Sequence, residues 1–267
     1  MPLKPNEMKT KILFPILAGA LLVCSCGQKS KSLEFEVDTA SINEAIPYSE
    51  TKKGNLAVDY SFEYPSAGEP AKTLETLQKS LIKGLFNDSL STDFQTALEK
   101  KIESLATDYR LDIDDMYSDP QYPPQDYMVD WEDNCTGHFG ETHGNVVSYY
   151  TVFSSYSGGA HGGYGTRGML FSLMDGSRVS QDRYFVDGYK KPLTKLLIKH
   201  LKDMEDNPVR DLSELFAEPY PNDNIFFQED GIVFTFETYE IASYAQGQMS
   251  STIPWSEVEP LIRPEFL

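Results

Sequence analysis

The pattern of apolar and polar residues predicts helices that pack on β-sheet. Residues 56–64 alternate apolar and polar side chains, which is typical of a half-buried strand. Apolar side chains then recur at three- and four-residue spacing over 74–85 and 94–105, which predicts two one-sided helices. Thr92 and Gln95 form a capping box that predicts the start of the second helix. One-sided helices of this kind are best explained by packing on a sheet.

A glycine-rich stretch organises the second half of the chain. Residues 149–156 are rich in aromatic and β-branched side chains, as a strand requires, and a second strand follows at 169–173. Six glycines surround His161 between them, which indicates backbone with positive φ or backbone packed too closely for a Cβ. The dipeptide Asp175-Gly176 is a strong hairpin signal.

A few further elements complete the expected fold. They are hairpins over 134–156 and 225–236, a helix from Pro192, and a short last helix capped by Ser256 and Glu259. The predicted fold class is therefore α+β, with an antiparallel β-sheet, helices packed on it, and two closely joined subdomains.

The N-terminal residues predict export and a lipid anchor. Lys9 and Lys11 precede an apolar run over 12–23, and a small residue precedes Cys26, which is the shape of a bacterial lipoprotein signal. The run is too short for a membrane-spanning helix. An ordinary cleaved signal is the alternative. We expect a lipid on Cys26 and a location in the bacterial cell envelope, lipid-anchored and periplasmic or outer-membrane associated.

These features divide the chain into four expected parts. Residues 1–25 form the signal peptide, and the polar residues 26–55 form a tether from the lipid to the folded part. Residues 56–147 form an N-terminal α+β subdomain, and residues 148–267 form the C-terminal domain.

The charge of the chain limits the partners it can have. The full chain carries −18, and cleavage after residue 25 removes three lysines and one glutamate and leaves −20. A surface this acidic repels nucleic acid and anionic lipid and favours cationic partners. Solubility alone is the other explanation of the charge. Once Cys26 carries lipid, Cys135 has no partner, so the sequence predicts no disulfide framework.

Residues 112–133 predict a long acidic loop. The segment holds eight acidic side chains and no basic one, and its prolines exclude a continuous helix or strand. Aromatic rings beside carboxylates suit a cationic ligand, through charge and cation–π contact. The alternative is a solvated loop whose rings pack on the domain. The candidate ligand-binding side chains are Tyr117, Tyr122, Tyr127 and Trp131.

The histidines carry the remaining candidate chemistry. His161, in its glycine loop, suits either a general base or a structural donor to nearby carbonyl groups. No spacing in the sequence assembles a nucleophile, an orienting acid and a base, so we predict no catalytic residue and no cofactor. His138 and His143 flank Glu141, but side chains five apart on a strand point to opposite faces, so we predict no metal site.

Two separated stretches, 156–185 and 231–262, resemble the C-terminal domain shared by RsiV-type anti-sigma factors and PdaC-type peptidoglycan deacetylases. The matching positions are Gly158-Gly159-Ala160-His161, Asp175-Gly176, Tyr239-Glu240-Ile241-Ala242, Gly247 and Ile253-Pro254-Trp255-Ser256-Glu257. The resemblance implies a domain outside the cytoplasmic membrane. In the RsiV-type proteins this domain binds lysozyme, a cationic muramidase, and in the deacetylases catalysis belongs to a separate domain. We therefore expect a stand-alone envelope module.

Taken together, these observations predict a non-catalytic lipoprotein that binds an extracytoplasmic protein or glycan. A lysozyme-like muramidase is its most concrete partner, and the lipid on Cys26 is its only expected membrane contact. A cell-wall hydrolase is the competing hypothesis, with His161 as base and Glu240 or Asp182 as acid. A structural subunit of an envelope assembly is a third. The candidate binding residues are Gly158, Gly159, His161, Tyr239 and Trp255.

Overall fold

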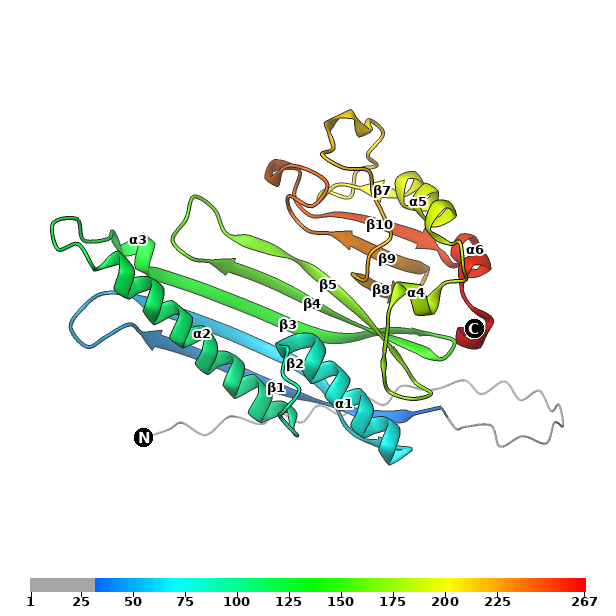
Figure 1. Cartoon of the computed structure of the whole chain (residues 1–267), viewed down its shortest axis with the longest axis horizontal. Coiled ribbons are helices and arrows are strands. Elements are labelled where there is room, and N and C mark those ends of the chain that lie inside the picture. The colour runs from blue at the N-terminus through cyan, green and yellow to red at the C-terminus, as the bar shows by residue number, and fades with distance from the viewer. Residues whose placement is uncertain (1–31) are drawn as a thin grey trace.

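The computed structural model describes residues 32–267 and contains two β-sheets with helices packed on them (Figure 1). The α+β fold class expected from the sequence is confirmed. The signal peptide and Cys26 lie outside the described residues. Within 32–267, no helix is both long and apolar enough to cross a membrane.

The larger sheet has six strands in the order β1-β2-β3-β4-β5-β6. These are β1 Glu34–Pro47, β2 Asn55–Glu69, β3 Asp130–His143, β4 Val146–Tyr156, β5 Gly163–Ser172 and β6 Arg178–Val179. Neighbouring strands are antiparallel except β2 and β3, which are parallel. A parallel pair needs a long crossover, and the helices between β2 and β3 supply it. The division expected at 147/148 falls inside β4, and the same sheet continues through β6.

Helices α1 Ala71–Phe86 and α2 Phe94–Met116 cover one face of this sheet (Figure 1). Leu81 of α1 and Tyr109 of α2 are fully buried in the core that the helices share with the sheet. The N-cap of α2 is Asp93, whose side chain accepts a hydrogen bond from the Thr96 N–H at 2.8 Å. The predicted Thr92–Gln95 capping box is therefore wrong: the N-cap lies one residue later, because aspartate caps a helix at least as well as threonine.

The predicted tether over 26–55 is wrong for its second half. Residues 34–47 form β1, which pairs with β2 along its whole length. All polar residues of β1 except Asp38 occupy exposed positions, while Ala40 is buried and Ile42 is packed against the core. Because β1 lies at the edge of the sheet and buries little, its sequence has the weak apolar pattern of a tether.

The acidic segment 112–133 is also more ordered than expected. Helix α2 continues to Met116, helix α3 occupies Asp126–Val129, and β3 begins at Asp130, so only residues 117–125 form a loop. Most carboxylates at the two ends lie on the exposed sides of these elements, while Ile113 and Val129 are buried. Asp133 is the exception, since it is partly buried and accepts a hydrogen bond from Tyr60 Oη at 2.8 Å. The prolines interrupt only the loop between the two helices.

The second sheet has four strands in the order β7-β10-β9-β8. They are β7 Leu201–Lys202, β8 Ile225–Gln228, β9 Gly231–Phe236 and β10 Met249–Pro254. The predicted 225–236 hairpin is confirmed as β8 and β9. Helices α4 Gln181–Tyr184, α5 Lys190–Lys199 and α6 Trp255–Val258 accompany this sheet. Its buried side chains form a second apolar cluster, which includes Leu197 and Phe234.

Candidate binding site

The structure brings together two of the predicted site residues, His161 and Tyr239, with a third ring, Tyr244. His161 stacks on Tyr244, with ring centroids 3.8 Å apart and 24° between planes. Tyr239 Oη lies 3.4 Å from His161 Nε2. Tyr244 Oη donates to the Gly162 carbonyl at 2.9 Å, which ties the glycine loop to the second half of the chain. We call His161, Tyr239 and Tyr244 the aromatic cluster.

Tyr239 is displayed by a turn in an unusual backbone conformation. Its φ is +69°, in the left-handed region that bulky residues rarely occupy, and 57% of the residue is exposed. The Glu240 side chain closes the turn by accepting from the Glu237 N–H at 2.7 Å and from Tyr220 Oη at 2.6 Å. Strain of this kind persists only where the surrounding contacts hold it.

An acidic turn borders the aromatic cluster. Tyr164, whose ring lies 5.9 Å from that of Tyr244, places its hydroxyl 3.7 Å from the Met204 sulfur. Met204 is exposed and sits between Asp203 and Glu205 in the turn that follows β7. Hydrogen bonds from the Asn207 and Glu205 backbone and from the Asn207 side chain lower the pKa of Asp203, so its carboxylate is charged at neutral pH. The aromatic cluster is therefore linked to the acidic turn through Tyr164 and Met204.

The two candidate glycines have different roles. Gly158 has a φ of +78°, and a Cβ there would lie 2.3 Å from the Met128 carbonyl oxygen, so the glycine permits close contact with α3. Gly159 has room for a side chain, because the atom nearest to a Cβ at that position would be the His161 carbonyl oxygen, at 3.9 Å. Only Gly158 is required by the backbone.

Trp255 lies apart from the aromatic cluster. Its ring stacks on His143, with centroids 3.8 Å apart and 5° between planes, and contacts Phe227 edge-on at 5.1 Å. It follows β10, whereas Tyr244 precedes that strand, so the length of β10 separates the two. Trp255 therefore belongs to the packing of the second half.

The four aromatic residues of the acidic segment also divide into two pairs. Tyr117 stacks on Tyr48 at 5.6 Å, and Trp131 packs edge-on against Tyr109 at 5.4 Å and donates to the Met128 carbonyl at 3.0 Å. These two rings therefore pack on the domain, as the alternative interpretation of the acidic segment predicts. The other two are exposed, Tyr122 by 77% and Tyr127 by 60%.

The hydrolase hypothesis requires His161 to pair with Glu240 or Asp182, and neither carboxylate is paired with it. In residues 32–267, the ring nitrogens of His161 contact only the Gly162 carbonyl and the Tyr239 hydroxyl. Glu240 is held by its own turn, and Asp182 accepts from Tyr189 Oη at 2.7 Å. Within this part of the chain, no carboxylate orients the His161 imidazole as the acid of a catalytic triad does.

The other histidines are also engaged separately. His138 Nδ1 lies 3.5 Å from Glu63, and His143 Nε2 lies 3.2 Å from Glu259. Each of these histidines therefore contacts a carboxylate other than Glu141. Within the described part of the chain, no group of three or more histidine, cysteine or acidic side chains is arranged to hold a metal.

The sequence did not indicate a cleft of about 560 Å³ between the helical face of the first sheet and the loops of the second half. Arg167 stands in it, stacked 4.4 Å above the Phe153 ring and paired with Glu237 through Nε at 2.6 Å. Burial raises the pKa of the Cys135 thiol in the cleft wall to about 12. A neutral thiol of this kind is a poor nucleophile.

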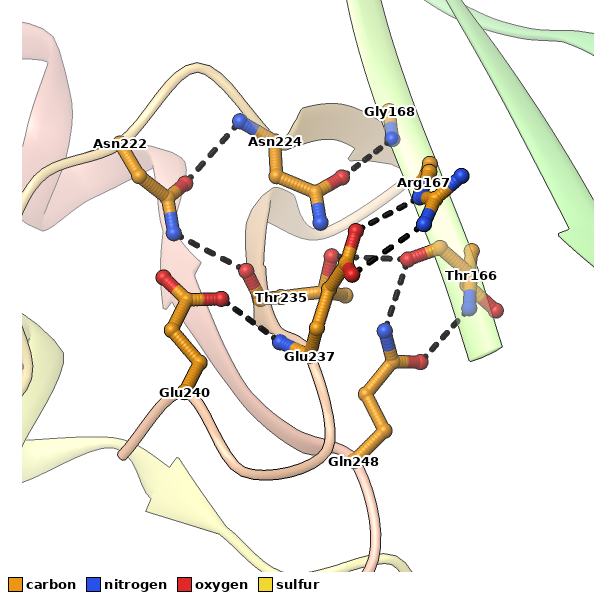
Figure 2. Close-up of polar contacts among 9 residues, drawn as sticks. All are labelled: Thr166, Arg167, Gly168, Asn222, Asn224, Thr235, Glu237, Glu240 and Gln248. Atoms are coloured by element: carbon orange, nitrogen blue, oxygen red, sulfur yellow. Dashed lines mark hydrogen bonds and ion pairs between the residues drawn. The ribbon is translucent and has the colours of Figure 1, made fainter. Parts of the chain in front are cut away.

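Figure 2 shows how the second half closes the free edge of β5. Strand β6 pairs with β5 only at Leu170 and Phe171. Farther along, the Gln248 amide accepts from the Thr166 N–H at 2.7 Å and donates to the Thr166 carbonyl at 2.8 Å, as a paired strand residue does (Figure 2). Asn224 accepts from the Gly168 N–H at 2.5 Å (Figure 2). These amides join the two halves and hold the Tyr239 turn near the glycine loop.

Part of the second half of the chain is similar to a known family. Residues 183–256 match the model of the family described as "Protein of unknown function (DUF3298)". This region contains Tyr239, Tyr244, Gln248 and Trp255 but not His161.

Two solved structures have a similar fold. A DUF3298 family member from Bacteroides fragilis superposes with a TM-score of 0.74 and 24% identity over 88% of this chain and 96% of that chain. A DUF3298 family protein from Pseudomonas aeruginosa has a TM-score of 0.57 and 12% identity, over 88% of this chain and 97% of that one. No curated protein matches the chain in sequence. At these identities the likeness establishes the fold alone.

Proposed function

We propose that the chain is a non-catalytic recognition module of the bacterial cell envelope that binds a cationic protein through its aromatic cluster. The observation that carries the proposal is the exposed Tyr239 ring, which a left-handed backbone displays beside His161, in a cluster that reaches the acidic turn through Tyr164. Rings next to carboxylates attract lysine and arginine side chains by cation–π contact and by charge.

A lysozyme-like muramidase is the partner that best fits this surface. Such an enzyme is small and cationic, and the chain carries −18. The lipoprotein signal predicted from the sequence would place the module where such an enzyme acts, and the resemblance to the RsiV-type domain implies the same class of partner. A glycan ligand is less well supported, because the acidic turn offers it no complementary charge.

The test is the affinity of the purified chain for hen lysozyme across a series of salt concentrations. We expect a complex of micromolar affinity or tighter that survives above about 0.15 M salt, since contacts between desolvated groups are screened less than exposed charges. Binding lost by that concentration would show only non-specific attraction and would contradict the proposal.

A pair of variants locates the surface. Tyr239→Asn removes the ring, and asparagine tolerates the left-handed backbone, so the turn should persist. We expect at least about a tenfold loss of affinity, as for an aromatic hot spot. Tyr122→Ala is the control, because Tyr122 is an exposed tyrosine outside the cluster. A loss only in Tyr122→Ala would move the site to the acidic loop.

A further inference from the structure

Strand β1 is a long, free edge of the first sheet. It spans fourteen residues, Glu34–Pro47, and β2 is the only strand paired with it among the described residues. In Figure 1 it lies on the side of the first sheet away from the second sheet. The outer strands β6 and β7 have two residues each and β8 has four. Among the outer strands of residues 32–267, β1 is therefore the longest and offers the most room for another strand.

Three contacts indicate which backbone N–H and C=O groups of β1 face away from β2. The Thr39 N–H donates to the neighbouring Asp38 side chain at 3.1 Å. The carbonyl oxygen of Glu63, the residue opposite Thr39, accepts a hydrogen bond from Tyr149 Oη at 2.9 Å. Pro65, opposite Val37, has no N–H, and its carbonyl accepts from Gln78 at 2.8 Å.

These contacts show that the odd-numbered residues do not pair their backbone groups with β2. Backbone groups of a strand alternate between its two sides. The N–H and C=O groups of Thr39, Ser41, Asn43 and Ala45 therefore point away from the sheet, beyond the single bulge at Glu36 and Val37. The Thr39 N–H is already bonded to Asp38, so the outward groups from Ser41 to Ala45 form the row on which a further strand can pair.

The charge of β1 indicates which strand fits. The strand carries four acidic residues, Glu34, Glu36, Asp38 and Glu44, and no lysine or arginine. Charged side chains are one of the features that keep edge strands from pairing with one another, and the charges of β1 are all acidic. A second copy of β1 would bring like charges together, which is unfavourable, whereas a cationic strand would bring opposite charges together.

We propose that β1 accepts an extended, lysine- or arginine-bearing segment of a partner protein as a seventh strand of the sheet. This addition uses main-chain hydrogen bonds for affinity and side-chain charge for selectivity. The surface is separate from the aromatic cluster, so the proposal stands or fails independently of lysozyme binding.

The probe is a fluorescein-labelled peptide of about eight alternating lysine and valine residues, titrated with the purified chain and followed by anisotropy. Its control is the same peptide N-methylated at alternate residues, which keeps the charge but removes the N–H groups along one edge. We expect at least about a tenfold weaker affinity for the methylated peptide. Equal affinity for the two peptides would overturn the proposal, because charge alone would then explain binding.

The matched variants are Ser41→Pro and Ser41→Ala. Ser41 is exposed, and its N–H points outward, so proline removes a donor that β2 does not use. We expect Ser41→Pro to weaken peptide binding at least about tenfold and Ser41→Ala to leave it unchanged. If Ser41→Pro does not fold, the methylated peptide decides the question. A concentration-dependent dimer in sedimentation that excludes the peptide would overturn the proposal in favour of a second copy.

Discussion

Exchanging Gln248 for glutamate tests whether its amide replaces a strand at the edge of β5. The wild-type amide accepts from the Thr166 N–H and donates to the Thr166 carbonyl (Figure 2). At neutral pH the carboxylate of Gln248→Glu keeps the first bond but cannot make the second. It instead places a negative charge against a carbonyl oxygen that also accepts from Thr235 Oγ1 at 3.0 Å.

The magnitude follows from these contacts. Loss of one hydrogen bond costs about 1 kcal/mol, and partial burial of a carboxylate facing an acceptor adds about 2 kcal/mol. A charge-assisted bond from the Thr166 N–H returns about 1 kcal/mol. We therefore expect the free energy of unfolding to fall by about 2 kcal/mol at pH 7.

The deficit should depend on pH. The protonated acid can donate to the Thr166 carbonyl, so folding raises the pKa of the introduced carboxyl above its unfolded value of about 4.3. A deficit of about 2 kcal/mol corresponds to a folded pKa near ~6. With a raised pKa, stability is retained below about pH 4.3 and lost as pH rises through about 6.

The assay is urea unfolding of the wild type, Gln248→Glu and Gln248→Ala at about pH 7 and about pH 4.5. The difference in free energy of unfolding between each variant and the wild type at the same pH cancels the titration of the carboxylates that the proteins share. Gln248→Ala should lose about 2 kcal/mol at both pH values, because it removes both bonds without adding a charge. A Gln248→Glu deficit that is the same at both pH values would refute the assigned role of the amide.

Three further predictions concern other parts of the molecule. Because burial raises the pKa of Cys135 to about 12, Ellman's reagent at pH 8 should label it rapidly only after unfolding; rapid labelling of the native protein would contradict this. Gly158→Ala should lower the free energy of unfolding by about 2–3 kcal/mol through strain and its clash with Met128, whereas Gly159→Ala should change it by less than about 0.5 kcal/mol in urea unfolding. Burial alone would raise the pKa of Asp175, but bonds from Ser177 and charge from Arg183 outweigh it and lower the pKa to about 2. Asp175→Asn should therefore cost about 1 kcal/mol at pH 7, after allowance for its exposure, and the difference should vanish as pH falls from about 4 to about 2.

The elements that the sequence predicted are those whose signal lies within a few residues. Apolar spacing identified α1, α2 and α5, and the hairpins β3–β4 and β8–β9 were found from alternation and turn residues. Strand β1 was missed because an edge strand buries too little to show alternation. The helical continuation of α2 to Met116 was missed because its carboxylates are on the solvent side, where helix and loop have similar composition.

The candidate site was only partly predictable for the same reason. The sequence selected His161 and Tyr239 individually, yet 78 residues separate them, and only the fold places them together. Tyr244 was not singled out, although it follows the Tyr239 motif closely. Trp255 was grouped with these residues, but β10 carries it to the other end of the second sheet.

The sequence by itself determined the properties that sum over residues or act locally, namely the acidic charge, the apolar faces of the helices and the glycine turns. The tertiary structure decided which distant groups meet: the stack of His161 on Tyr244, the bonds of Gln248 to Thr166, and the free edge of β1. Local propensities depend on neighbours along the chain, whereas these contacts depend on how two sheets pack. Packing is set by the burial of the whole apolar surface, so no short motif encodes it.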